Sequence, residues 1–208
     1  MMLLVREAYD LILKDLSEIK NALIDLARRY KNTPMAGRTH SVHAVPMTFG
    51  FKVSVWLDEI SRHIERFEEM KKRLFVGNIT GAVGTFASFG EKGPEIQKLT
   101  LEKLGLGVPA IFWHAARDRI AEFLNLLAMT ASTLSKIADQ ILILMRPEIL
   151  EIEEPIPPGH VGSSTMPQKR NPFLSEMSVA LTRIIRAYAH IMTESMETLD
   201  ERNFSNGL

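Results

Sequence analysis

Four long segments of the chain repeat apolar residues every three and four positions, the spacing of a helix that buries one face. The first segment has two uncharged rows, namely Val5, Ile12, Ile19 and Leu26, and Tyr9, Leu16, Leu23 and Tyr30. The second runs from about Phe49 to Leu74, and Lys71 is the one charged residue in its rows. These patterns predict two long helices in the first part of the chain.

The third segment has the most uniform aliphatic pattern, with rows formed by Ile120, Leu127, Leu134 and Ile141, and by Leu124, Ala131, Ala138 and Met145. The fourth begins with Asn171 as a helix cap and Pro172 in the first turn, and its apolar row ends near Met196. A helix of about 27 residues is roughly 40 Å long. Sustained seven-residue spacing predicts shallow crossing angles of about 20° between such helices.

Three segments rich in proline and glycine interrupt the helical pattern and are predicted to be loops. They are Thr33–Pro46, Val76–Pro94 and Glu153–Pro172. A shorter helix from about Glu95 to Leu104 follows the second of them. The third loop is long enough to favour a functional role.

The fold class predicted by these patterns is all-α, an elongated bundle of long helices that forms one domain over residues 1–208. Apolar rows on several helix faces favour a subunit that completes its core with other copies of the chain. The alternative is a closed, monomeric four-helix bundle.

The composition narrows the class of protein. The 208 residues are 46% hydrophobic and carry 25 basic and 25 acidic side chains, so no net charge attracts the chain to nucleic acid or to an anionic membrane. Cysteine is absent, which excludes disulfides and thiolate chemistry. The apolar stretches are shorter than a membrane span, and charge rather than a cleavage site follows Met1–Val5. We therefore expect a soluble, cytoplasmic protein.

The segment Gly162–Pro172 has the most specific chemistry in the sequence. It joins a glycine-serine stretch to two cations, Lys169 and Arg170, at the start of a long helix. Such a segment can close over a ligand and bind a carboxylate. From composition alone, the segment is equally well interpreted as a solvated linker whose lysine and arginine keep it soluble.

This segment resembles the signature loop of the fumarase/aspartase superfamily, Gly-Ser-Ser-x-Met-Pro-x-Lys-x-Asn-Pro, at every defining position. The segment Gly37–Gly50 resembles Gly-Arg-Thr-His-Gly-Val-His-Ala-Glu-Pro-x-Thr-Phe-Gly of the adenylosuccinate lyase branch. Gly81–Ala87 and Arg117–Arg119 are similar to further segments of that branch. The resemblance extends from about Leu4 to Asn206 and corresponds to the central helical domain of longer family members.

The resemblance implies β-elimination, in which a base removes a proton next to a carboxylate and an acid protonates the departing nitrogen, so that fumarate leaves. Ser163 would be the base and His40 the acid. His43 matches another histidine of the pattern and is a possible site residue. The substrate-binding residues would be Lys169, Asn171, Glu176, Arg38, Thr39, Ser164, Met166, Arg202 and Ser205. No metal or organic cofactor is implied, and a His40–His43 metal pair lacks further ligands at suitable spacing.

The implied substrate is a succinyl-nucleotide, either adenylosuccinate or the succinyl-carboxamide ribotide of purine synthesis. The implied assembly is a homotetramer in which each active site takes segments from several chains. The departures from the branch include Ser41 in place of a glycine, Gln168 in place of a histidine and Gly207 in place of a serine. The alternatives are a carboxymuconate cycloisomerase or another superfamily lyase, or a non-catalytic oligomerisation module.

Overall fold

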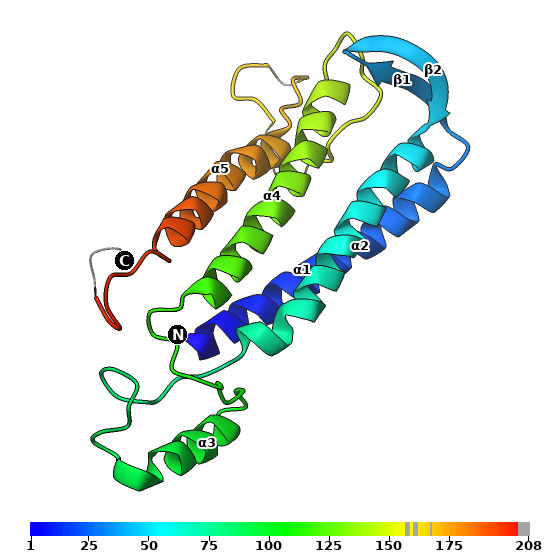
Figure 1. The fold of residues 1–208 in the computed structure, drawn as a ribbon. Helices are drawn as coiled ribbons and strands as arrows, with labels where there is room; N and C mark the ends of the chain where they lie inside the picture. Colours follow the sequence, from blue (N-terminus) through cyan, green and yellow to red (C-terminus); the bar gives the residue numbers. More distant parts are fainter. Residues whose placement is uncertain (157–158, 160–161, 167, 204–208) are drawn as a thin grey trace. The chain divides into compact units, whose positions relative to one another are not determined.

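The computed structural model describes residues 1–156, 159, 162–166 and 168–203, and these residues are mostly helical (Figure 1). The four long helices predicted from the apolar rows are present, as is the shorter one, and the helical fold class is confirmed. The helices are α1 (Met2–Arg29), α2 (Phe49–Leu74), α3 (Gly93–Lys103), α4 (Asp118–Leu144) and α5 (Phe173–Glu194), with a 3-10 turn at Gly90–Lys92.

The prediction of a loop over residues 33–46 is wrong, because this segment forms an antiparallel β-hairpin between α1 and α2 (Figure 1). Strand β1 (Pro34–Thr39) pairs with β2 (Val42–Thr48) through a two-residue turn. Both prolines are compatible with this hairpin, because Pro34 is the first residue of its strand and Pro46 adjoins a register shift. The exposed face of β2 gives no alternation of apolar and polar residues, so the sequence pattern did not reveal the strand.

Two glycines allow close backbone approaches around the hairpin. A Cβ atom on Gly37 would lie 2.5 Å from the carbonyl oxygen of Val45, where the register of the two strands shifts. A Cβ atom on Gly50 would lie 2.6 Å from the carbonyl oxygen of Ala27, so the first turn of α2 packs directly on the end of α1. Both positions therefore require glycine.

The chain divides into two compact units. The first consists of Met1–Ile19, Arg62–Leu127 and Ala187–Leu208, and the second of Lys20–Ser61 and Ala128–Arg186. The prediction of one domain over residues 1–208 stays a prediction.

Aromatic side chains form the core of the first unit. The ring of Tyr9 packs edge-on against Phe67 and Phe75, with centroids 5.8 and 5.0 Å apart, and Phe67 in turn meets Phe123 at 6.4 Å. The hydroxyl of Tyr9 donates a hydrogen bond to the carbonyl of Phe67 at 2.9 Å, and burial raises the pKa of Tyr9. The tyrosine therefore buries its ring without leaving its polar group unsatisfied.

Small and polar residues contribute to the packing of the second unit. Thr182 of α5 donates a hydrogen bond to the carbonyl of Ala131 of α4 at 3.2 Å, and both residues are buried. On another face of α4, Thr133 donates to a carboxylate oxygen of Glu59 at 2.7 Å, and Lys136 pairs with the same carboxylate. Small side chains allow α4 and α5 to approach closely, and the threonine hydroxyls find partners at these contacts.

The predicted apolar rows differ in their burial. The row of α2 is confirmed as core, since Val53, Ile60, Phe67 and Leu74 are fully buried. The row of α5 is exposed instead: Leu181 and Ile184 of the second unit are 50% and 52% exposed. The buried positions of α5 include Ser175, Thr182 and Ala189, which repeat every seven residues.

Helix α4 also differs from one expectation. By length and composition alone it could cross a membrane, although the sequence pattern predicted no segment of that kind. Core helices of soluble proteins meet the same two criteria. Thr133 and Lys136, both on this helix, make polar contacts with Glu59.

Candidate active site

His40, the predicted acid, lies in the turn at the tip of the β1–β2 hairpin. His40 and Ser41 have φ angles of 51° and 63°, and the flanking residues Thr39 and Val42 form the last pair of the ladder. Two consecutive residues with positive φ are typical of a tight hairpin turn, which favours glycine at the second position. The turn exposes the side chain of His40 to solvent.

Arg38 joins both strands of the hairpin to a segment that follows α4. Its Nη1 donates to the carbonyl of Ala36 at 3.3 Å, and its Nη2 lies 3.5 Å from Nε2 of His43. The same two nitrogens donate to Oε2 and Oε1 of Glu151 at 3.0 and 2.6 Å. The predicted substrate residue Arg38 therefore makes a bidentate ion pair within the chain.

Lys52 of α2 adds a second cation to this group of residues. Its Nζ donates to Oε1 of Gln140 at 2.6 Å and lies 5.7 Å from the centre of the Trp56 ring. Burial and then the charge of Arg38 lower the pKa of Lys52, and Glu151 opposes this effect. The hydrogen bond from Arg38 lowers the pKa of Glu151, so this carboxylate stays charged at neutral pH.

Ser163, the predicted base, is half-buried at the beginning of the signature loop. Its Oγ accepts hydrogen bonds from the backbone amides of Thr165 and Met166 at 3.3 and 3.2 Å. Hydrogen bonds donated to an oxygen favour its charged form. The loop therefore places two donors where a serine alkoxide would need them.

The remaining predicted residues of the signature loop surround this turn. Asn171 donates from Nδ2 to the carbonyl of Gly162 at 2.7 Å, which closes the loop on itself. The amide of Lys169 donates to the carbonyl of Met166 at 3.0 Å. The side chains of Ser164, Met166 and Lys169 are exposed, as they must be to meet a ligand.

Glu154 fixes the beginning of α5 at the foot of the same loop. Its Oε2 accepts from the amide of Leu174 at 3.0 Å, and its Oε1 accepts from the amide and hydroxyl of Ser175 at 3.0 and 2.7 Å. A carboxylate at this end of a helix satisfies amides that have no partner within the helix. Glu176, a predicted substrate residue, follows in the first turn of α5 and is exposed.

Most of the predicted site lies in the second unit. This unit contains the hairpin residues Arg38, Thr39, His40 and His43, and the loop and α5 residues Ser163, Ser164, Met166, Lys169, Asn171 and Glu176. The described hydrogen bonds of Ser163 stay within its own loop, and none of them reaches His40. Arg202 belongs to the first unit, and Ser205 lies outside the described residues.

The sequence patterns did not identify Glu151 or Glu154. Both follow α4 in an acidic stretch without a recognisable spacing, and their partners Arg38 and Ser175 are 113 and 21 residues away. No signal in a single sequence marks such contacts. Within the described part of the chain, no three histidine or carboxylate side chains lie close enough to share a metal ion.

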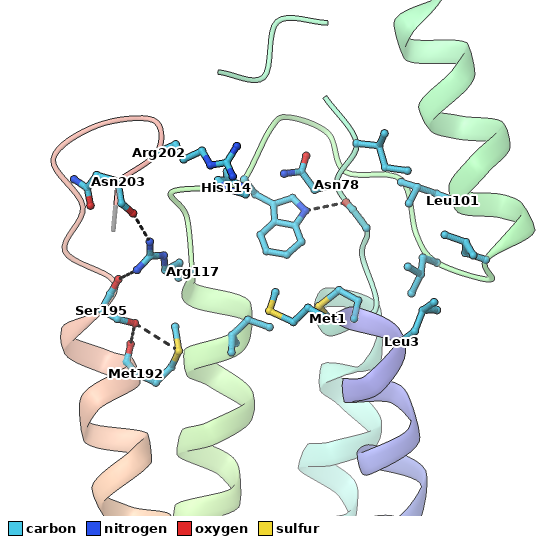
Figure 2. Close-up of a pocket in the computed structure, with 17 residues that line it drawn as sticks. Met1, Leu3, Asn78, Leu101, His114, Arg117, Met192, Ser195, Arg202 and Asn203 are labelled. Atoms are coloured by element: carbon cyan, nitrogen blue, oxygen red, sulfur yellow. Dashed lines mark hydrogen bonds between the residues drawn. The ribbon is translucent and has the colours of Figure 1, made fainter. Parts of the chain in front are cut away.

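The first unit contains a cavity of about 520 Å³ (Figure 2). Its walls are largely apolar and include Trp113, whose Nε1 donates to the carbonyl of Gly77 at 2.8 Å. Arg117 donates to the carbonyls of Ser195 and Asn203 at 2.9 and 3.3 Å. Burial, followed by the charges of Arg202 and Arg117, lowers the pKa of His114 at the same cavity. The cavity therefore combines an apolar wall with a cationic side.

Known proteins resemble the chain over nearly its full length. The N-acetyl-S-(2-succino)cysteine lyase of Dickeya dadantii is 47% identical over 199 residues, which are 96% of this chain and 44% of that protein. The adenylosuccinate lyase of Pyrococcus abyssi is 49% identical over 184 residues, which are 88% of this chain and 41% of that protein. The chain thus spans less than half the length of these relatives.

A solved structure agrees with the fold. The 3-carboxy-cis,cis-muconate lactonizing enzyme of Pseudomonas putida has a TM-score of 0.93 and 35% identity, and the match covers 99% of this chain and 46% of that one. A protein-family model described as Lyase matches residues 1–186. The chain therefore belongs to this lyase family, within the fumarase/aspartase superfamily.

Proposed function

We propose that the chain provides the central part of a lyase that releases fumarate from a succinate carrying a heteroatom at C2. In the proposed reaction, a base removes a proton from C3, next to a carboxylate. The bond from C2 to the heteroatom then breaks, its electrons leave with the heteroatom, and an acid protonates that atom. The C2–C3 double bond of fumarate forms from the electrons of the C–H bond.

The observation that carries this proposal is the turn around Ser163. A serine hydroxyl is a weak base in water, so the role requires an environment that favours the alkoxide. Hydrogen bonds from the amides of Thr165 and Met166 to Oγ supply part of that environment. Lys169, six residues further along the same loop, would bind the substrate carboxylate and stabilise the carbanion.

His40 is proposed as the acid. It lies in the turn at the tip of the hairpin, and Ser163 lies in a different segment of the same unit. Imidazole changes charge near neutral pH, which suits the protonation of a leaving group. Its exposure leaves the ring accessible to a substrate or to another subunit.

Adenylosuccinate is our first candidate for the substrate. The hairpin sequence resembles that of adenylosuccinate lyases, and the Pyrococcus abyssi relative at 49% identity has that activity in its name. Arg202 and Ser205 would then contact the nucleotide phosphate. The succinyl-carboxamide ribotide would be cleaved in a parallel step.

N-acetyl-S-(2-succino)cysteine is the second candidate, because the Dickeya dadantii relative matches over more of the chain, 96% against 88%. The two candidates differ in the leaving atom, which is sulfur in one and nitrogen in the other. The elimination itself is the same. Gly207 replaces a serine in the segment that would contact the nucleotide phosphate, and Gln168 replaces a histidine of the adenylosuccinate lyase branch.

A cycloisomerase function is a third candidate, supported by the 35% identity to the Pseudomonas putida structure. It would produce a lactone instead of fumarate. The remaining alternative is a non-catalytic module that only assembles.

The proposed assembly is a homotetramer, and the exposed row of α5 supports it. In the second unit this row contains Leu174, Met177, Leu181 and Ile184, which are 54%, 42%, 50% and 52% exposed. Apolar residues at three- and four-residue spacing on an exposed helix favour packing against helices of other copies. Leu181→Asp should dissociate the assembly in light scattering, whereas Arg183→Asp, on a different face of the same helix, should not.

A chimera tests the function and the substrate together. Residues 1–208 replace the matching segment of the Dickeya dadantii lyase in one chimera, and of the Pyrococcus abyssi lyase in the other. Fumarate formation is followed by ultraviolet absorbance with each candidate substrate. Turnover of one substrate in both chimeras would assign it to the central segment, and conversion of added 3-carboxy-cis,cis-muconate to a lactone would favour the cycloisomerase. Folded, assembled chimeras without any turnover would contradict the proposal.

A further inference from the structure

We infer that Glu151 is a positioning residue for His40, acting through Arg38, and that Arg38 holds the hairpin in place instead of binding substrate. This inference rests on the proposed function for its catalytic consequence. Its structural part concerns only the second unit and stands on the contacts of Arg38.

The guanidinium of Arg38 contacts three segments of the second unit. Nη1 bonds to Ala36 on β1, Nη2 lies beside His43 on β2, and both nitrogens bond to Glu151. The side chain therefore connects the two strands with each other and with the segment after α4. Only Thr39 separates Arg38 from His40, the first residue of the hairpin turn.

The tip of the hairpin has little packing of its own to hold it. A two-stranded hairpin is marginally stable by itself. Every residue of β2 from Val42 to Pro46 is exposed, so this part of the strand has no apolar face packed on a core. The positive φ angles of His40 and Ser41 add local strain. A fixed position for His40 therefore depends on the contacts of the neighbouring Arg38.

The ion pair between Arg38 and Glu151 is partly shielded from solvent. The two side chains are 19% and 26% exposed, well below the ion pair between Arg170 and Glu153, at 53% and 50%. Bidentate geometry and partial burial make such a pair stronger than an exposed one. The charge of Lys52 also lowers the pKa of Glu151, so this carboxylate balances more than one cation. A substrate carboxylate could form a bidentate pair with Nη1 and Nη2 of Arg38 only by displacing Glu151.

The position of Glu151 in the chain links the hairpin to the signature loop. Glu154 lies three residues later and fixes the start of α5, at the foot of the Ser163 loop. The segment 151–154 thus contacts the hairpin through the carboxylate of Glu151 and the first turn of α5, which follows the signature loop, through the carboxylate of Glu154. Loss of Glu151 should release the hairpin while the start of α5 stays in place.

Hydrogen exchange in the 208-residue chain tests the structural part. Glu151→Gln should reduce the protection of the hairpin amides in residues 34–48 at least tenfold, and leave the amides of α3 unchanged. Glu153→Gln is the matched control, because its carboxylate lies 3.8 Å from Arg170 in an exposed pair, and it should change neither region. The double variant Arg38→Glu with Glu151→Arg should restore part of the protection. Unchanged protection in Glu151→Gln would overturn the inference.

Kinetics of the active chimera test the catalytic part. Glu151→Gln should lower kcat about tenfold or more with KM unchanged, because the acid is misplaced and the substrate contacts remain. If Arg38 is a substrate ligand that Glu151 restrains, the same variant should lower KM. That result would overturn the inference while leaving the lyase function intact. An inactive chimera would contradict the proposed function, and the exchange experiment would still decide the role of Glu151.

Discussion

The two compact units of this chain are stabilised in different ways. In the first, aromatic rings pack edge to face around Tyr9 and Phe67, and the hydroxyl of Tyr9 bonds within the same core. In the second, the carboxylate of Glu151 binds the hairpin through Arg38, and the carboxylate of Glu154 caps the first turn of α5 after the signature loop. The residues with predicted chemical roles concentrate in the second unit, with Arg202 in the first. The packing of buried aromatic rings therefore stabilises the first unit. Charged hydrogen bonds stabilise the parts of the second unit that contain the residues with predicted chemical roles.

The largest effect should come from removing an aromatic ring of the first unit. Phe67→Ala leaves a cavity at a fully buried position and should lower the free energy of unfolding by about 3–5 kcal/mol. Urea denaturation followed by circular dichroism measures this loss. Phe51→Ala is the control, since Phe51 is 64% exposed, and its effect should stay within about 0.5 kcal/mol. Equal effects of the two variants would contradict the assignment of the core.

The cap of α5 should have the next largest effect. Glu154→Ala removes the acceptor of the amides of Leu174 and Ser175 and should cost about 1–2 kcal/mol. Exchange protection of the first turn of α5 should fall, as measured by mass spectrometry. Glu153→Ala is the control for the loss of a neighbouring carboxylate, and it should leave the exchange protection of the first turn of α5 unchanged.

The stability of the hairpin in the second unit should depend on pH through the carboxylate of Glu151. Because Arg38 lowers the pKa of Glu151 below its ordinary value of 4.5, the ion pair stabilises the fold above that pH. This stabilisation should disappear as the pH falls through the lowered pKa of Glu151. Amide resonances of the hairpin should follow this transition in nuclear magnetic resonance spectra, and Glu151→Gln should abolish it. A transition that persists in this variant would assign the effect to another group.

The smallest effect should be a gain of stability. Ser41 has a φ angle of 63°, where glycine is free of strain, so Ser41→Gly should stabilise the hairpin by up to about 1 kcal/mol. In contrast, Ser178→Gly within α5 should destabilise the chain by a similar amount. Thermal unfolding of both variants checks the sign. A loss of stability in Ser41→Gly would contradict the strained turn.

The sequence predicted the helices well where large apolar residues repeat without interruption. Val53, Ile60, Phe67 and Leu74 are such a row, and all four are buried. It could not predict the burial of α5, because a row of leucine and isoleucine has the same pattern whether it faces its own core or another subunit. The inward face of α5 has Ser175 and Thr182, which no hydrophobicity pattern marks.

The candidate site was predicted only as far as its local motifs extend. The signature loop and the histidines of the hairpin could be found because their residues are adjacent in sequence. The hairpin itself was missed, since its turn has His40 and Ser41 where glycine or asparagine is usual. The bond between Arg38 and Glu151 spans 113 positions, and only the folded chain brings the two residues together.

The most direct test of the proposed chemistry is fumarate release by the chimera that turns over its substrate, compared with its Ser163→Ala variant. If Ser163 is the base, the variant should lose at least about a thousandfold in kcat and keep its assembly in light scattering. Ser17→Ala, at an exposed position of α1, should retain full turnover. Undiminished fumarate release by Ser163→Ala would contradict the role of this serine as the base.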